Sequence, residues 1–117
     1  MDFETAKALC RTFPGAVEDV KWGHVAVFSV GLKMFACSDL DVPAARISFK
    51  AEAERFLELT DRPGIIPAPY MARIGWVCVD DASAISDDEA AALLRRAYEL
   101  IFAKLSKKMQ REIGEGN

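Results

Sequence analysis

Residue types that usually carry catalytic or metal chemistry are scarce in this chain. It has one histidine, His24, and three widely separated cysteines, Cys10, Cys37 and Cys78, without a C-x-x-C pair. A structural zinc site needs four nitrogen or sulfur ligands at close, paired spacing, and a catalytic nucleophile needs a partnered base. We therefore expect buried free thiols, a structural role for His24, and no catalytic residue, metal or cofactor.

Long apolar runs and an excess of positive charge are lacking too. The longest uninterrupted apolar runs are a few residues, far below the roughly 20 that a membrane-spanning helix needs. The first residues, Met1 to Glu4, hold two acids and no apolar core, unlike a secretory signal. The net charge of −3 argues against a protein that coats nucleic acid through phosphate contacts alone. These features predict a cytoplasmic protein without a membrane partner, and a monomer is favoured.

What the chain does contain is the composition of an ordinary globular domain. Its 117 residues fall at the commonest size for one domain, with 51% apolar and 28% charged residues. No internal repeat or low-complexity segment interrupts it. We therefore expect a single domain over residues 1–117.

Local patterns in the first third predict a helix and a β-hairpin. Apolar residues recur at three- and four-residue steps over residues 3–13, which is typical of a helix with one buried stripe, and Pro14-Gly15 ends it. Residues 16–23 are interpreted as a loop or a single turn. Residues 24–30 and 33–38 are rich in β-branched and aromatic side chains and are separated by a glycine turn, which predicts an antiparallel pair.

The middle of the chain predicts two more strands around a short helix. Residues 46–50 alternate between polar and apolar side chains, as a strand with one wet face does. Residues 51–59 are rich in Ala, Glu and Leu and predict a short helix. Residues 65–70 contain two prolines, which rules out a central strand and favours an extended crossing loop. Residues 73–80 predict the last strand.

The last helix has the clearest start signal in the sequence. Ser86 followed three residues later by Glu89 is a capping box, and acidic residues there suit the positive end of the helix dipole. Gly114 closes the pattern. One continuous apolar stripe is expected along this helix, formed by Leu94, Tyr98, Ile101, Phe102, Leu105 and Met109.

This order of elements predicts the fold class. Strands that follow one another through tight turns form an antiparallel sheet, and amphipathic helices need a face to cover. We expect an α+β two-layer sandwich: an antiparallel sheet of four to five strands, with the N- and C-terminal helices packed together on one face and the other face open.

Short motifs along nearly the whole chain resemble one known family in their order. They are Phe13-Pro14-Gly15-Ala16, Lys21-Trp22-Gly23, Gly31-Leu32-Lys33-Met34-Phe35-Ala36, Ser48-Phe49-Lys50-Ala51, Pro63-Gly64-Ile65-Ile66-Pro67-Ala68-Pro69-Tyr70, Trp76-Val77 and Tyr98-Glu99-Leu100. With them the sequence resembles the MmcQ/YjbR proteins, which implies a frataxin-like (CyaY-like) fold. The resemblance implies less about activity: members are described as DNA-binding candidates because their fold is like a double-winged DNA-binding motif, which is an argument from fold alone.

A nucleic-acid site would use cations on the open face together with one aromatic ring. The candidates are Lys21, Trp22, Lys33, Arg46, Lys50 and Arg73. The alternative interpretation makes Trp22 and Trp76 core anchors and the cations solvated strand ends. The basic C-terminal end of the last helix is a second candidate surface. Iron, which a frataxin-like fold would suggest, is rejected because the first helix lacks an acidic ridge.

Two functional hypotheses therefore follow. The first is a non-enzymatic binding module with DNA as its partner. The alternative is a module that binds a small molecule or a protein between the Pro67–Tyr70 loop and the sheet, since loops on a rigid scaffold often line recognition surfaces. A deep apolar pocket beside Trp22, Tyr70 or Trp76 would favour the alternative.

Overall fold

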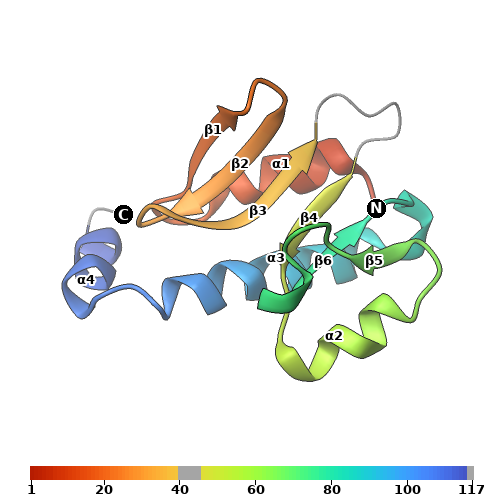
Figure 1. The fold of residues 1–117 in the computed structure, drawn as a ribbon. Coiled ribbons are helices and arrows are strands. Elements are labelled where there is room, and N and C mark those ends of the chain that lie inside the picture. The colour runs from red at the N-terminus through yellow and green to blue at the C-terminus, as the bar shows by residue number, and fades with distance from the viewer. Residues whose placement is uncertain (40–45, 116–117) are drawn as a thin grey trace.

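The computed structural model of the chain describes residues 1–39 and 46–115 (Figure 1). In chain order the elements are α1 (Phe3–Thr12), β1 (Val17–Lys21), β2 (Val25–Val30), β3 (Lys33–Asp39), β4 (Ile47–Lys50), α2 (Ala53–Thr60), β5 (Ile65–Pro67), the 3-10 turn η1 (Ala72–Ile74), β6 (Trp76–Val79), the 3-10 turn η2 (Ala82–Ala84), α3 (Asp87–Phe102) and α4 (Lys107–Glu115).

The strands form one antiparallel sheet in the order β1-β2-β3-β4-β6-β5. The α+β class is confirmed, but within residues 1–39 and 46–115 the sheet has six strands rather than four or five. The two unexpected strands lie at its edges. β1 lies where the sequence predicts a loop or a single turn; three of its five residues are charged, and in the structure all five are exposed. β5 has only three residues and ends at Pro67, which an edge strand tolerates because its outward N–H needs no partner.

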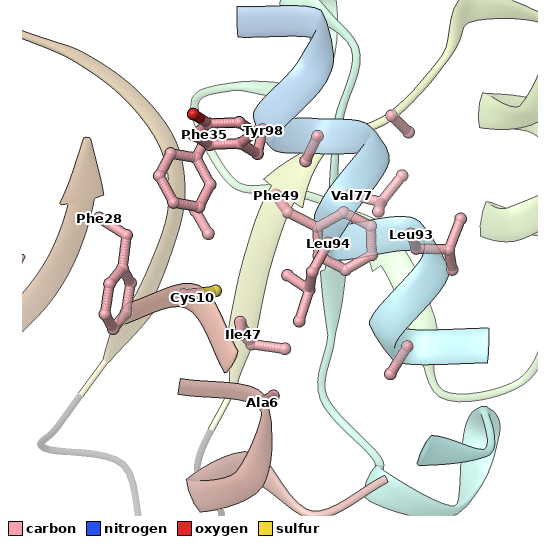
Figure 2. Packing of buried hydrophobic residues seen from close by; sticks show 14 of the residues in the cluster. Ala6, Cys10, Phe28, Phe35, Ile47, Phe49, Val77, Leu93, Leu94 and Tyr98 are labelled. Carbon is pink, nitrogen blue, oxygen red and sulfur yellow. The ribbon is translucent and has the colours of Figure 1, made fainter. Parts of the chain in front are cut away.

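The helices cover one face of this sheet, and the main core lies between the two layers. Figure 2 shows α1 and α3 bringing side chains against Phe35, Ile47 and Phe49. The Phe35 ring meets the edge of Tyr98 with the ring centroids 5.5 Å apart, a preferred aromatic geometry. The N- and C-terminal helices therefore pack on the same face, as predicted.

The predicted single C-terminal helix is two helices. α3 ends at Phe102, and Lys104 N and Leu105 N donate to carbonyls three residues back, which tightens the last turn. Ser106 Oγ then accepts from Met109 N at 3.1 Å and caps the start of α4. The apolar stripe hid this break because Leu105 is buried and Met109 packs against the core across it.

Two further boundaries differ locally from the sequence expectation. Residues 72–74 form η1 instead of opening the last strand, and Gly75 at φ 85° leads into β6. The predicted cap of α3 is half correct: Ser86 Oγ accepts from Glu89 N at 3.1 Å. The Glu89 carboxylate does not reach back, because it accepts from Arg62 Nη1 at 2.7 Å.

Candidate functional site: a hollow on the open face of the sheet

The face of the sheet turned away from the helices carries a set of small, polar and sulfur-containing side chains. Directly paired residues on neighbouring strands point to the same side. Val27 pairs with Cys37, Cys37 pairs with Ser48, and Ser48 pairs with Cys78, so these residues form a row across β2, β3, β4 and β6. The residues between them in each strand, such as Phe28 and Phe49, belong to the main core.

Residues 68–74 form a covering segment that packs over part of this open face. Ala68, Trp76 and Cys78 are buried together as a small second core, and Met34, Cys37, Ile66 and Met71 pack against it. Because the segment includes η1 and covers β6 and its neighbours, the open face is not a flat platform. Part of it lies beneath the covering segment, and the rest is open.

A hollow of about 610 Å³ lies beside the covering segment. The β1–β2 turn contributes to it from one part of the chain, and the covering segment contributes from another. Its lining residues are Trp22, His24, Val25, Met34, Cys37, Asp39, Arg46, Ser48, Pro69, Tyr70, Met71 and Cys78. A volume of this size falls in the range of small-molecule sites, roughly 300–1,000 Å³.

Two aromatic side chains in this lining are exposed. Trp22 keeps 69% of its surface exposed and Tyr70 is fully exposed at 102%, whereas Trp76 is buried at 3%. The interpretation of both tryptophans as core anchors is therefore correct for Trp76 and wrong for Trp22. Neither Trp22 nor Tyr70 contributes appreciably to the core, although each is a large apolar group.

Trp22 occupies a turn position that disfavours its residue type. Trp22 and Gly23 both have positive φ, 54° and 76°, and His24 N donates to Lys21 O at 3.2 Å. Lys21 pairs with Val25, so residues 22–24 form the hairpin loop. Two successive central residues of positive φ are typical of a type I′ turn, for which Asn-Gly is preferred. A residue with a Cβ in this left-handed region carries a cost of about 1–2 kcal/mol.

Tyr70 also occupies a turn position that disfavours its residue type. Met71 N donates to Ala68 O at 3.1 Å, Pro69 is the second residue of that turn, and Tyr70 has φ 67° as its third. Proline followed by a residue of positive φ is the signature of a type II turn, whose third position favours glycine. Both exposed aromatics of the hollow thus stand where glycine or asparagine suits the backbone better.

Charged side chains in the lining are few. Arg46 is the one lysine or arginine among the described lining residues, and it shares the hollow with His24 and Asp39. Burial raises the pKa of the Cys37 thiol to about 11, with a smaller effect from Cys78. Burial also raises the pKa of Cys78. Both thiols are therefore protonated at neutral pH, and a protonated thiol is a poor nucleophile.

The sequence-predicted nucleic-acid residues are only partly brought together. Trp22 and Arg46 line the hollow, and Lys21 lies next to Trp22, paired with Val25 of the lining. Lys33 stands at the opposite end of the β2–β3 hairpin, where it pairs with Val30.

The two remaining candidates lie around η1. Lys50 Nζ donates to the Ile74 carbonyl, and burial, followed by the charge of Lys104, lowers the pKa of Lys50. Arg73 is exposed within η1, after the lining residue Met71. The sequence predicted a structural role for His24 and buried free thiols for Cys37 and Cys78, and Asp39 was not singled out. The convergence of these residues on one hollow depends on strand order. The Pro69-Tyr70 turn was the one signal for the far side of the hollow.

A second depression, about 320 Å³, lies between α2 and α3. Two of its lining arginines pair with lining carboxylates: Arg96 Nε lies 3.1 Å from Glu52, and Arg55 Nη2 lies 3.7 Å from Glu89. The other lining cations are also engaged, Lys50 with the Ile74 carbonyl and Arg95 over the Phe13 ring, so the depression is a weaker candidate site. In the described ranges, no group of three or more His, Cys, Asp or Glu residues is placed to hold a metal ion, and no helix there is long and apolar enough to cross a membrane.

The fold and the open-face hollow define an α+β protein with helices on one side of a six-stranded antiparallel sheet. The model of the YjbR family matches residues 11–100, so the chain belongs to that family, as the sequence motifs predicted. No curated protein matches.

Two solved structures share the fold. Protein DR2400 of Deinococcus radiodurans, which carries the domain DUF419, is 25% identical with a TM-score of 0.84, over 96% of this chain and 87% of that one. A protein from Pseudomonas syringae is 22% identical with a TM-score of 0.72, over 86% of this chain and 99% of that one, and shows the fold alone.

Proposed function

We propose that this chain is a non-enzymatic binding module that takes a small molecule in the open-face hollow. The observation that carries the proposal is the hollow itself, about 610 Å³ in volume and lined by Trp22 and Tyr70. Ligand sites in proteins are typically concave and mainly apolar, with a few polar groups that orient the ligand. The lining has this composition, with Arg46, Asp39 and His24 among apolar and sulfur-bearing side chains.

Duplex DNA is a poorer match for the same surface. The covering segment makes the open face uneven, Lys33 lies at the far end of the hairpin, and Lys50 already donates to the Ile74 carbonyl. Duplex binding depends on several cations that neutralise phosphates along one surface. Burial raises the pKa of the Cys37 and Cys78 thiols, so neither would serve as an activated cysteine nucleophile in the hollow.

The four methionines give a direct test. Met34 and Met71 line the hollow, whereas Met1 and Met109 lie outside it. Protein labelled with ¹³C at the methionine methyl groups is titrated with two neutral probes, 1-hexanol and indole. We expect the methyl resonances of Met34 and Met71 to shift while those of Met1 and Met109 stay in place. Resonances that all remain fixed, or that all shift together, contradict the proposal.

Single-stranded nucleic acid is a second candidate, and one observation favours it. Trp22 and Arg46, both predicted as nucleic-acid contacts, line the same hollow, and Lys21 lies beside Trp22. An exposed aromatic ring stacks on an unpaired base, and cations contact the phosphates.

Labelled oligothymidylate and a DNA duplex, titrated at about 50 mM and about 200 mM salt, test this candidate. Binding should weaken steeply with salt, and Arg46→Ala should weaken it while Lys33→Ala, at the other end of the hairpin, should not. Lack of binding at the lower salt concentration would remove nucleic acid as a ligand.

A further inference from the structure

Both exposed aromatic residues of the hollow occupy backbone positions that disfavour their residue type. Trp22 and Tyr70 come from different segments, each sits at positive φ in a tight turn, and each is exposed. Elsewhere in the described chain, five glycines occupy positions of positive φ. Strained backbone that no packing explains is often found at ligand clamps, where the side chain is kept for binding.

The third non-glycine residue at positive φ in the described ranges is Leu32, at φ 69° and 96% exposed. It lies in the β2–β3 turn and is not among the residues that line the hollow. Positive φ alone is therefore not a mark of binding. Trp22 and Tyr70 differ from Leu32 because their strained turns place two aromatic rings in the lining of one hollow. Leu32 therefore provides a matched control.

The rest of the lining indicates which ligand would meet these rings. Met34, Met71, Cys37 and Cys78 supply sulfur-bearing surface, and thioether sulfur makes favourable contacts with aromatic rings. Arg46 supplies the one guanidinium of the described lining, whose planar fork matches a carboxylate or phosphate in bidentate fashion. A flat ring therefore suits the aromatic and sulfur-bearing surface, and an anionic group suits Arg46.

We propose that the hollow binds a planar aromatic ring that carries an anionic group, with the ring against Trp22 and Tyr70 and the carboxylate or phosphate at Arg46. This inference rests on the proposed function of the hollow as a small-molecule site. Asp39 and His24 share the lining with Arg46, so the anion is held by the directed fork of the guanidinium more than by long-range attraction. The ligand's affinity therefore depends on salt less steeply than that of a protein with many phosphate contacts.

Two matched pairs of probes test the ring and the anion separately. Indole-3-acetate is compared with indole, and AMP with adenosine; the two anionic members distinguish a carboxylate from a phosphate. Octanoate serves as an anion without a ring. The readouts are the Met34 and Met71 methyl resonances and calorimetry. At least one anionic aromatic should bind about tenfold or more tightly than both its neutral counterpart and octanoate, and Arg46→Gln should remove that preference.

Turn-compatible variants test the rings without damaging the fold. Trp22→Asn and Tyr70→Gly place favoured residues in the two turns, so both should unfold at the same or higher urea concentration than the parent. Each should weaken binding of the anionic aromatic by about tenfold, as loss of a stacking partner does. Leu32→Asn makes the same kind of backbone change outside the hollow and should leave binding unchanged.

The outcomes separate the two proposals. If hexanol and indole shift Met34 and Met71 but the anionic aromatics bind no better than their neutral counterparts, the ligand class is wrong and the small-molecule site stands. The ligand class is also wrong if Trp22→Asn and Tyr70→Gly bind like the parent. If no probe shifts these two resonances, both proposals fail.

Discussion

On the helix face of the sheet, Phe28, Phe35 and Phe49 are fully buried and Phe35 meets two further rings, whereas on the open face Met34 and Cys37 are only half-buried and Trp22 is exposed. The helix face is packed by residue types that suit their backbone and their neighbours. The open face instead keeps aromatic groups in solvent on turns that disfavour them. The two faces thus differ in packing: the helix face carries the main core, and the open face combines a small second core with exposed aromatic side chains.

Adjacent residues of β3 give the largest expected contrast between the faces. Phe35 is fully buried against Phe13, Phe28 and Tyr98, so Phe35→Ala should lower the free energy of unfolding by about 3–5 kcal/mol. Met34 belongs to the open face and is half-buried, so Met34→Ala should cost about 1 kcal/mol. Urea denaturation of both variants measures these two losses in the free energy of unfolding. Equal losses would mean that the open face contributes to stability as the core does.

The cysteines extend the comparison to reactivity. Burial raises the pKa of Cys37 on the open face to about 11 and that of Cys10 in the main core to about 12. At pH 8, Cys37 should react with iodoacetamide about a hundredfold more slowly than an unburied thiol, because only the thiolate reacts. Cys10, which has no exposed surface, should react only when the protein unfolds. Mass spectrometry of the alkylated peptides over time checks both rates, and rapid labelling of Cys10 would contradict the packing described for α1.

The strained turns should respond in the opposite direction to core residues. Trp22→Asn and Leu32→Asn should each raise the free energy of unfolding by about 1 kcal/mol, since asparagine tolerates the left-handed region better than larger side chains. Both variants are compared with the parent in urea. A loss of stability in Trp22→Asn, with a gain in Leu32→Asn, would mean that the Trp22 ring supports the fold after all.

The smallest expected effect concerns the ion pair between Arg62, which follows α2, and Glu89 of α3. The hydrogen bond from Arg62, 2.7 Å from Glu89, holds the pKa of Glu89 below its ordinary value of 4.5. A lowered folded-state pKa means that the unfolded state binds protons first, so this contribution is present above pH 4.5 and is lost as the pH falls through the folded-state pKa. Glu89→Gln should cost about 0.5–1 kcal/mol at pH 7, because the pair is partly exposed, and less at pH 3.5. An equal cost at both pH values would mean that the ion pair contributes nothing.

Local patterns predicted the elements whose signals are local. The hairpin of β2 and β3, the alternating strand β4 and the cap of α3 at Ser86 follow from residues that are close in sequence. β1 was missed because an exposed edge strand needs no buried face, and so Val17–Lys21 shows no apolar periodicity. The break before α4 was missed because its apolar stripe continues, and only the cap at Ser106 marks it.

The hollow was foreseen in part. The sequence named Trp22 and Tyr70 as possible neighbours of one apolar pocket, and Trp22 also as a nucleic-acid contact, but nothing local joins residue 22 to residue 70. Their meeting depends on the strand order, which places β6 beside β4 and brings the covering segment back across the open face. The same strand order separates Lys33 from Arg46. Their spacing along the chain does not reveal this separation.

The exposed edge strand β1 has a further consequence, for solubility. Its outer edge has no neighbouring strand among the described elements, and Val17 and Val20 are more than half exposed. Such an edge invites pairing with another chain, and charged residues are the usual protection. Glu18 and Asp19 stand between the two valines, and the hydrogen bond from Arg11 keeps the pKa of Glu18 below its usual range. Glu18 therefore keeps its charge, and with it this protection of the edge, further into acidic solution than an unpaired glutamate would.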